Sequence, residues 1–356
     1  MEINETLAQW SEILMVVAGF AYTFAFIAFT WDLAVNSRAT VQAEENTVQD
    51  RELVGAGART RTASSARMAG VEQGTGARGA GYKASAMAKI NEHVADADMR
   101  YDGPRRPAAR IGVALMAVAA IIHAGGVFSR GFAAHRVPWG NMYEFLTTGA
   151  FLVAIIFLLV LVFRDIRFVG TIVSGLATLM MTVASVVYPT PVGHLVPALQ
   201  SYWLVIHVSI AVLASAIFTI TFSMAVLQLI QDRRERMILE EGKTGWAFMR
   251  LVPSAQTLEN FAFRLNAVAF VMWTFTLAAG AIWAEVAWGR YWGWDTKEVW
   301  TFIIWVVYAA YLHARATRGW TGTRSAWLSI VGYLCVIFNF SVVNVFFSGL
   351  HSYSGL

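Results

Sequence analysis

The chain has 356 residues, of which 57% are hydrophobic and only 14% are charged. Soluble domains carry about 25% charged residues, so this composition excludes a water-soluble globular protein and indicates an integral membrane protein. The single cysteine, Cys335, excludes a disulfide framework, a cysteine zinc site, an iron–sulfur cluster and thioredoxin-like chemistry. No Cys-x-x-Cys-His motif is present, which excludes covalent haem attachment to this chain.

Eight apolar runs are long enough to cross a hydrocarbon layer of ~30 Å, which takes about 20 helical residues. In chain order they cover 13–33, 110–128, 143–163, 167–188, 202–230, 264–285, 298–314 and 326–347. The runs lack the alternation of barrel strands, and lipid admits only helices or closed barrels. The sequence therefore predicts an all-α, polytopic integral membrane protein with about eight transmembrane helices.

The basic residues predict the orientation in the membrane. The connections at 34–110, 164–167, 231–264 and 314–325 hold 23 of the 27 Lys and Arg residues, and the other side holds the remaining four. Because positive charge favours the cytoplasmic side, we expect a multi-pass protein of the plasma membrane with both termini outside the cytoplasm. The net charge of +4 follows from this topology, so no nucleic-acid partner is expected.

Residues 34–109 differ from the rest of the chain, since they are rich in Ala, Gly, Ser and Arg and poor in large apolar residues. Such a stretch cannot bury enough apolar surface to offset the entropy of ordering. We predict a mostly disordered, basic cytoplasmic insertion with a short helix around 84–98. It would separate the first transmembrane helix, within 1–33, from a membrane domain of seven helices at 110–356, and a docking role is the alternative to a simple tether.

Tryptophans are concentrated around an outward-facing loop predicted at 285–297. Six of the 14 tryptophans fall within 23 residues, namely Trp283, Trp288, Trp292, Trp294, Trp300 and Trp305. An interfacial aromatic belt also attracts tryptophan, but it would scatter these residues over several helix ends. Concentrated beside two glycines, they favour a flat apolar shelf for a large planar ligand that bears acidic groups.

Five of the seven histidines are predicted to share the outer layer with this loop. A rise of 1.5 Å per residue places His123 and His207 about 8 Å below the outer surface. His135 and His194 fall in outer loops, and His351 follows the eighth helix. Two imidazoles beside an aromatic shelf suit an iron porphyrin. Zinc is the competing metal, but three closely placed ligands are not visible in the sequence.

Several segments resemble a known family. Residues 288–298, WGRYWGWDTKE, resemble the "WWD" signature of haem-handling proteins of cytochrome c maturation, and specifically the CcsA (also ResC) family of the System II pathway, often labelled CcsB in actinobacteria. The segments that resemble other parts of this family, in the same order, are 137–144, 201–208, 311–313 and 350–353. The resemblance covers about 110–356 plus the first helix, and the insertion at 34–109 is longer than the family usually shows.

The resemblance implies two haem sites. At an external site, His207 and His351 would be the axial ligands of a haem b. The other residues implied there are Trp288, Trp292, Trp294 and Asp295. Within the membrane, His313 would be one ligand of a second haem, whose other histidine would come from a ResB-like membrane subunit. The resemblance implies no catalytic residue separate from the haem site, and His123 could serve either a structural hydrogen bond or the lining of a haem path.

The implied function is that of the haem-handling subunit of a cytochrome c synthase (cytochrome c haem lyase). Haem would be carried to the outer face and joined by thioethers to the Cys-x-x-Cys-His segment of apocytochrome c. One buried cysteine cannot keep those thiols reduced, so a thioredoxin-like reductant is implied as an indirect partner. A haem exporter or chaperone without synthase activity would use the same residues. A b-type electron-transfer cytochrome would need an inner partner for His313, which this sequence lacks at the same depth.

Overall fold

The computed structural model of the chain describes residues 2–62, 99–100, 105–195, 199–241, 246–317 and 319–351. The main helices of these parts are α1 (Glu5–Thr62), α3 (Pro107–Ala134), α4 (Met142–Phe163), α5 (Gly170–Val187), α6 (Tyr202–Glu241), α7 (Ala255–Trp288), α8 (Thr296–Ala316) and α9 (Thr323–Phe346). Short 3₁₀ turns at Arg167–Val169 and Ala247–Leu251 precede α5 and α7. Eight helices of the described residues are long and apolar enough to cross a membrane, which confirms the predicted all-α, multi-pass fold.

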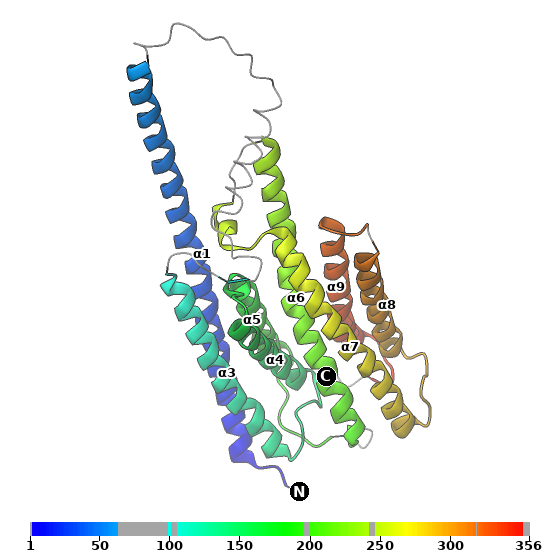
Figure 1. Cartoon of the computed structure of the whole chain (residues 1–356). Coiled ribbons are helices and arrows are strands. Elements are labelled where there is room, and N and C mark those ends of the chain that lie inside the picture. Colours follow the sequence, from blue (N-terminus) through cyan, green and yellow to red (C-terminus); the bar gives the residue numbers. More distant parts are fainter. Residues whose placement is uncertain are drawn as a thin grey trace.

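Several helices are longer than the apolar runs that predict them. α6 continues past residue 230 to Glu241, and α1 continues past residue 33 to Thr62, so both project beyond the other helices at one end (Figure 1). α1 therefore extends into the first part of 34–109, the stretch that was predicted to be mostly disordered. Ala, Gln, Glu and Arg are frequent in that part and have high helix propensity, which favours a helix there. The short helix predicted at 84–98 lies outside the described residues.

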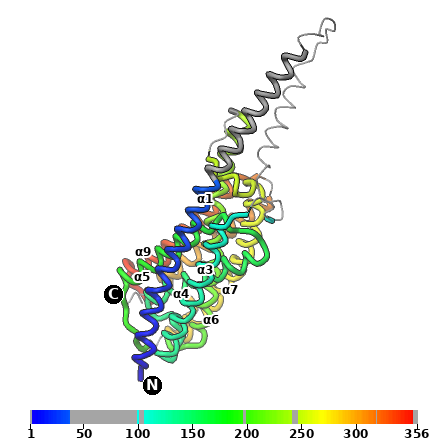
Figure 2. Tube along the Cα trace, turned by 90° about the vertical axis from the view of Figure 1, so that its left-hand side faces the viewer, coloured from blue at the N-terminus to red at the C-terminus, as the bar shows by residue number. Residues whose placement is uncertain are grey.

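The helices form two groups that meet along α6. In the first group α1 packs against α3 and α5, and α4 packs against α5; Figure 2 shows the N-terminal part of α1 lying along the bundle. In the second group α6 packs against α7 and α9, and α8 packs against α9. Contacts of α6 with α4 join the two groups. A pocket between the groups would therefore be lined by α4 on one side and by α6 to α9 on the other.

Close packing in the first group depends on small residues. The ring of Phe29 in α1 lies against Gly112 of α3 and Gly170 of α5, where an added Cβ would come within 2.9 Å and 2.6 Å of that ring. Small residues let helix backbones approach closely in lipid, where apolar surfaces gain little from mere burial. The three helices therefore fit around one aromatic side chain.

A buried ion pair joins α1 to α3 across the insertion. Asp32 and Arg106 are 1% and 3% exposed, and Arg106 Nε donates to Asp32 Oδ2 at 3.0 Å. The other carboxylate oxygen of Asp32 accepts from the backbone N–H of Ala109 at 3.1 Å, in the first turn of α3. The carboxylate thus satisfies a free N–H at a helix start and fixes the two ends of the insertion beside each other.

Candidate functional site

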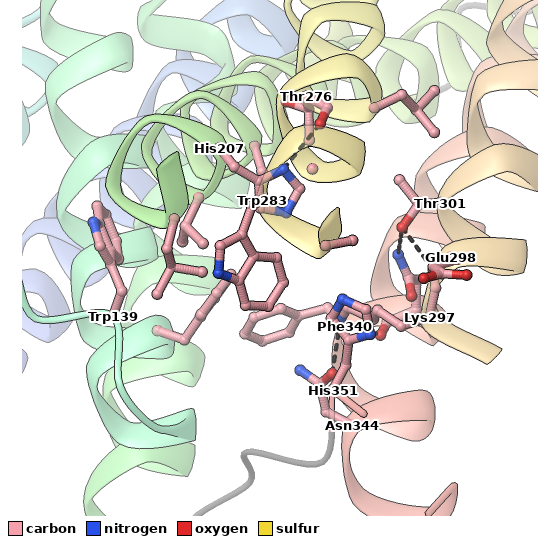
Figure 3. A pocket seen from close by; sticks show the side chains of 18 of the residues that line it. Trp139, His207, Thr276, Trp283, Lys297, Glu298, Thr301, Phe340, Asn344 and His351 are labelled. Carbon is pink, nitrogen blue, oxygen red and sulfur yellow. Dashed lines mark hydrogen bonds between the residues drawn. The ribbon is translucent and has the colours of Figure 1, made fainter. Parts of the chain in front are cut away.

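A pocket lies between α4 and the helices α6 to α9, beside the loop that connects α7 to α8 (Figure 3). Its aromatic lining consists of Trp139, Phe145, Trp273, Trp283, Trp292 and Phe340, with Tyr291 at its edge. Its polar lining includes His207, Lys297, Glu298, Asn339, Asn344 and His351. Apolar walls with a few convergent polar groups are typical of a ligand site.

His207 lies near the start of α6 and is oriented by α7. Its Nδ1 is 2.9 Å from the backbone carbonyl oxygen of Thr276, and because a carbonyl only accepts, Nδ1 carries the proton. Nε2 is then left with its lone pair, which can bind a metal. Gly280 makes this position accessible, since an added Cβ there would lie 2.6 Å from Cε1 of His207.

His351 follows α9 and is oriented by the start of α8. Its Nδ1 is hydrogen-bonded to Oδ2 of Asp295, and because a carboxylate only accepts, Nδ1 is the donor. Nε2 of His351 is therefore also available to a metal. The same hydrogen bond lowers the pKa of the Asp295 carboxyl below its usual value. Gly349 allows this approach, because an added Cβ would collide with Oδ1 of Asp295.

Trp283 of α7 contacts both imidazoles. Its ring is 6.0 Å from that of His207 with an interplanar angle of 17°, and 5.5 Å from that of His351 with an angle of 67°. Trp288 adds a second edge contact to His351 at 4.8 Å. The buried indole of Trp283 therefore holds together two histidines that are 144 positions apart in the chain.

The tryptophan-rich loop is fixed by its two ends. α7 ends at Gly289, whose φ of 70° lies in the left-handed region that glycine adopts without strain. α8 begins at a capping box formed by Asp295 and Glu298. The Glu298 carboxylate accepts from the backbone N–H groups of Asp295 at 3.1 Å and Gly293 at 2.7 Å. Trp294 has a φ of 58°, which is uncommon for a residue with a side chain.

The residues that the sequence analysis assigned to the external site differ in their contacts. His207, His351 and Trp292 line the pocket, whereas Trp288 and Asp295 contact His351 from outside the lining. Trp294 is 78% exposed and contacts the edge of Trp292 at 5.8 Å. His313 does not belong to this cluster, because it lies exposed in the last turn of α8.

Several pocket residues were not assigned from the sequence, among them Trp283, Lys297 and Gly280. Trp283 belongs to the tryptophan cluster, but its position between the two histidines depends on how α6 and α7 pack. Lys297 and Gly280 gave only a weak signal, namely a lysine after the loop aspartate and a glycine within an apolar span. Their roles follow from contacts between distant segments, which spacing along the chain does not contain.

His123 lies in a separate cluster in the first group of helices. It is fully buried, and its Nδ1 is 3.1 Å from the hydroxyl of Tyr22 in α1. Its ring also contacts that of Phe151 in α4 at 5.6 Å. His123 does not line the pocket, so of its two predicted roles the contacts favour the structural hydrogen bond.

A buried charged network supports the α4 side of the pocket. Glu144 is fully buried and forms ion pairs with Arg130 at 2.8 Å and Arg136 at 2.7 Å. Asn141 accepts from the backbone N–H of Glu144 at 2.9 Å, but the Glu144 carboxylate binds the arginines and the N–H of Gly140 instead of completing a capping box with Asn141. The network fixes the connection that carries Trp139.

The polar lining is incompletely satisfied within the described residues. Nε1 of Trp139, Oε1 of Glu298 and Oδ1 of Asn339 are buried there without a hydrogen-bond partner. Buried polar atoms of folded proteins are normally paired, so these atoms indicate a bound ligand or water. Two histidines with available Nε2 atoms, aromatic walls and such polar atoms fit a porphyrin that carries a metal ion.

The enclosed part of the pocket is smaller than a porphyrin. Its volume is about 160 Å³, and a cavity of about 150 Å³ holds a molecule of the size of benzene. A porphyrin would therefore extend through the open side of the pocket or displace side chains there. Tyr291 and Trp292, which are 62% and 36% exposed, lie in the loop at this side.

Comparisons with known proteins agree with the sequence resemblance. The family described as "Cytochrome C assembly protein" matches residues 139–351. The chain is 36% identical to the cytochrome c biogenesis protein CcsA of Guillardia theta over 62% of its own length and 77% of that protein. It is 34% identical to the CcsA protein of Synechococcus elongatus over 68% of its own length and 87% of that protein.

Among solved structures, the chain is similar to the cytochrome c haem lyase CcmF, with a TM-score of 0.49 and 18% identity. This similarity covers 78% of the chain and 48% of the CcmF chain, so the present chain spans about half the length of that relative.

Proposed function

Because this chain belongs to the cytochrome c assembly protein family, and within it to the CcsA proteins, we propose that it presents haem for attachment to apocytochrome c. Membership of this family and the eight helices long enough to cross a membrane support a multi-pass membrane protein that handles haem in cytochrome c biogenesis. The proposal adds the System II pathway, an extracytoplasmic site in the plasma membrane, and thioether formation with the Cys-x-x-Cys-His segment.

One observation carries this proposal: two histidines from distant segments share a pocket, and each has its Nδ1 proton bound elsewhere. His207 donates to a backbone carbonyl and His351 donates to a carboxylate. Metal-binding histidines nearly always donate their second ring N–H in this way, because it fixes the tautomer and the ring orientation. His207 and His351 would thus be the axial ligands of haem b as the transported substrate.

The remaining residues of the site would position the porphyrin. Trp283 and Trp288 hold the two imidazoles, Trp292 supplies an apolar wall, and Trp294 extends the exposed aromatic surface. Asp295 would increase the basicity of the His351 ligand through its hydrogen bond. The contribution of the chain is orientation and exclusion of water, which raise the effective concentration of the reacting groups.

The bond-forming step adds each thiol S–H of apocytochrome c across one vinyl group of the haem. The sulfur bonds to a vinyl carbon, the thiol hydrogen ends on the other carbon, and no net oxidant or reductant is consumed. The thiols must arrive reduced, so a thioredoxin-like protein would act upstream. The histidine of the Cys-x-x-Cys-His segment would then replace one axial ligand.

His313 would belong to a second haem site, shared with a ResB-like membrane subunit. Its exposure near the inner end of α8 supports this proposal, since a ligand shared with another chain must lie on the surface of its own bundle. The concentration of Lys and Arg at the opposite end from the pocket supports an extracytoplasmic pocket.

Two other functions, haem export and electron transfer by a b-type cytochrome, can be distinguished from haem attachment. A haem exporter would use the same pocket, but would not form a covalent product when the purified complex is mixed with apocytochrome c and a reductant. A b-type cytochrome would require His123 and His207 as an outer ligand pair. These residues lie in separate clusters, because His123 is hydrogen-bonded to Tyr22 and His207 to the backbone carbonyl of Thr276. Their separation disfavours a b-type cytochrome.

The test is the reduced-minus-oxidised absorption spectrum of the chain, purified together with its ResB-like partner. We expect a low-spin b-type haem signal that His207→Gly and His351→Gly both weaken, with partial recovery of cytochrome c maturation on addition of imidazole. His194→Gly is the matched control, since His194 is exposed in an outer loop and does not line the pocket. Unchanged spectra in the first two variants would refute the ligand assignment.

A further inference from the structure

Lys297 is a half-buried lysine in an unfavourable position. It lies in the first turn of α8, two residues after the N-cap Asp295, and lines the pocket with His207 and His351. The N-terminus of a helix carries a partial positive charge, so a cation is disfavoured there. Removing a charged group from water also raises the free energy of the folded chain, unless an opposite charge offsets it.

The contacts of Lys297 are with neutral acceptors. Its Nζ donates to the backbone carbonyl of Asn339 at 2.9 Å and to Oδ1 of Asn344 at 2.7 Å. An ammonium group has three N–H donors, so one donor is left for a ligand. In the described part of the chain, Lys297 forms no ion pair with a carboxylate. The nearby Asp295 is hydrogen-bonded to His351, and its charge acts on Lys297 through space without a direct contact.

Glu298, which also lines the pocket, does not supply the missing charge. One of its oxygens is held by the backbone N–H groups of Gly293 and Asp295 at the positive end of α8. This arrangement offsets the charge of Glu298 locally and fixes the loop. The positive charge of Lys297 thus lies in a pocket whose walls are largely aromatic, with Glu298, Asn339 and Asn344 as the other polar lining beside the two histidines.

We propose that Lys297 binds the propionate carboxylates of the porphyrin that His207 and His351 ligate. This inference rests on the proposed function and adds the orientation of the porphyrin in its plane. Haem is apolar except for two propionates on one edge, and an ammonium with a free donor in an apolar pocket is the matching counter-charge. The two contacts to α9 hold the ammonium in place before the ligand arrives.

The vinyl groups lie on the porphyrin edge opposite the propionates. With the propionates at Lys297, the vinyl edge is directed toward the other side of the pocket, where Figure 3 shows Trp139 beyond His207 and Trp283. The connection that carries Trp139 is fixed by the Glu144 network. Lys297 therefore selects which edge of the haem an approaching thiol can reach.

The experiment compares two probes, haemin and haemin dimethyl ester, whose propionates are masked. Both are titrated into the full chain, purified with its partner and depleted of haem, and binding is followed by absorbance. We expect the wild type to bind haemin at least about tenfold more tightly than the ester, since losing one partner of a buried charge pair has an effect of this size or larger. Lys297→Met should lose this preference, and Lys297→Arg should keep it.

Each outcome bears on a defined claim. Equal binding of the two porphyrins by the wild type would overturn the role of Lys297 while leaving the haem-handling function intact, and this comparison needs no variant. A preference that persists in Lys297→Met would overturn it as well. Binding of neither porphyrin would overturn the proposed function and this inference together. His207→Gly should weaken both porphyrins alike, because the iron is present in each.

Discussion

At the scale of single residues, the position of His207 depends on the missing side chain of Gly280. An added Cβ would lie 2.6 Å from Cε1 of the imidazole, so the ring would have to leave the carbonyl of Thr276 that orients it. Overpacking of this kind costs about 1–3 kcal/mol. We expect Gly280→Ala to lower the haem affinity about tenfold or more.

Gly19→Ala is the control for this substitution. It adds the same methyl group to a membrane helix, where the nearest atom, Cβ of Met181, would be 3.7 Å away in ordinary contact. Haem content per protein, measured from the absorption spectrum, should be unchanged in Gly19→Ala and reduced in Gly280→Ala. Equal haem content in the two variants would show that the approach of α7 does not fix His207.

Asp295 affects His351 through charge as well as position. Asp295→Asn keeps a hydrogen-bond acceptor but removes the charge that increases the basicity of the imidazole. Loss of such an outer partner lowers metal affinity about 10–100-fold in known sites. We expect weaker haem retention in Asp295→Asn at neutral pH, measured by haem transfer to an excess of a haem-binding protein.

The difference in stability between the wild type and Asp295→Asn should depend on pH in a defined direction. The pKa of Asp295 is lowered in the folded chain by the hydrogen bond from His351, so the carboxylate contributes fully above the unfolded value of about 3.9. The stabilisation by this carboxylate is lost as the pH falls through the lowered pKa that Asp295 has in the folded chain. The stability difference between wild type and Asp295→Asn should therefore be constant at neutral pH and vanish in strong acid. A difference that persisted unchanged in strong acid would contradict the assigned hydrogen bond.

At the scale of helices, the pair of α1 and α3 depends on a buried charge. Asp32→Asn removes the carboxylate that offsets the charge of Arg106 and weakens the acceptor at the start of α3. Breaking a buried pair costs about 3–5 kcal/mol, whereas an exposed pair contributes at most about 1 kcal/mol. We expect a clear drop in the thermal unfolding midpoint of Asp32→Asn in detergent.

Arg236→Gln is the matched control, because Arg236 is 59% exposed and pairs with Asp232 within one turn of α6. Its unfolding midpoint should stay close to that of the wild type. If the two variants unfolded alike, the Asp32–Arg106 pair would contribute no more than a surface pair.

The helices themselves are largely predictable from hydropathy, and their ends are less so. The run at 143–163 corresponds to α4, Met142–Phe163, because this helix lies almost wholly within the predicted apolar layer. The run at 264–285 lies within a longer α7, Ala255–Trp288, whose first turns are polar. Hydropathy detects the part of a helix that is embedded in lipid, so polar extensions need helix propensity and capping signals such as Ser254.

The candidate site is predictable only in part for a related reason. The sequence places His207, His351 and the tryptophan loop in one outer layer, since depth follows from counting along a helix. Which rings touch depends on the packing of α6 against α7 and on the path of the chain after α9. Trp283 and Lys297 therefore gain their roles from contacts over 40 or more positions, such as that of Lys297 with Asn339.

At the scale of the whole molecule, the pocket and the insertion lie at opposite ends of the bundle. The pocket lies beside the loop between α7 and α8, and α1 enters the insertion at the other end, where α1 and α6 project (Figure 1). The Asp32–Arg106 pair fixes the chain where the insertion leaves and returns. The geometry of the pocket therefore does not require the intervening residues.

Deleting residues 45–95 tests this separation. We expect cytochrome c maturation, measured by haem staining of the products, to stay near the wild-type level, because a shorter connection only lowers the entropy cost of closing the loop. His207→Gly in the full-length chain should abolish maturation at the same membrane level of protein, which shows that the assay responds to the pocket. If the deletion abolished maturation while the protein accumulated normally, the insertion would have to bind a component of the pathway. The basic residues of 34–109 would then be the first to substitute.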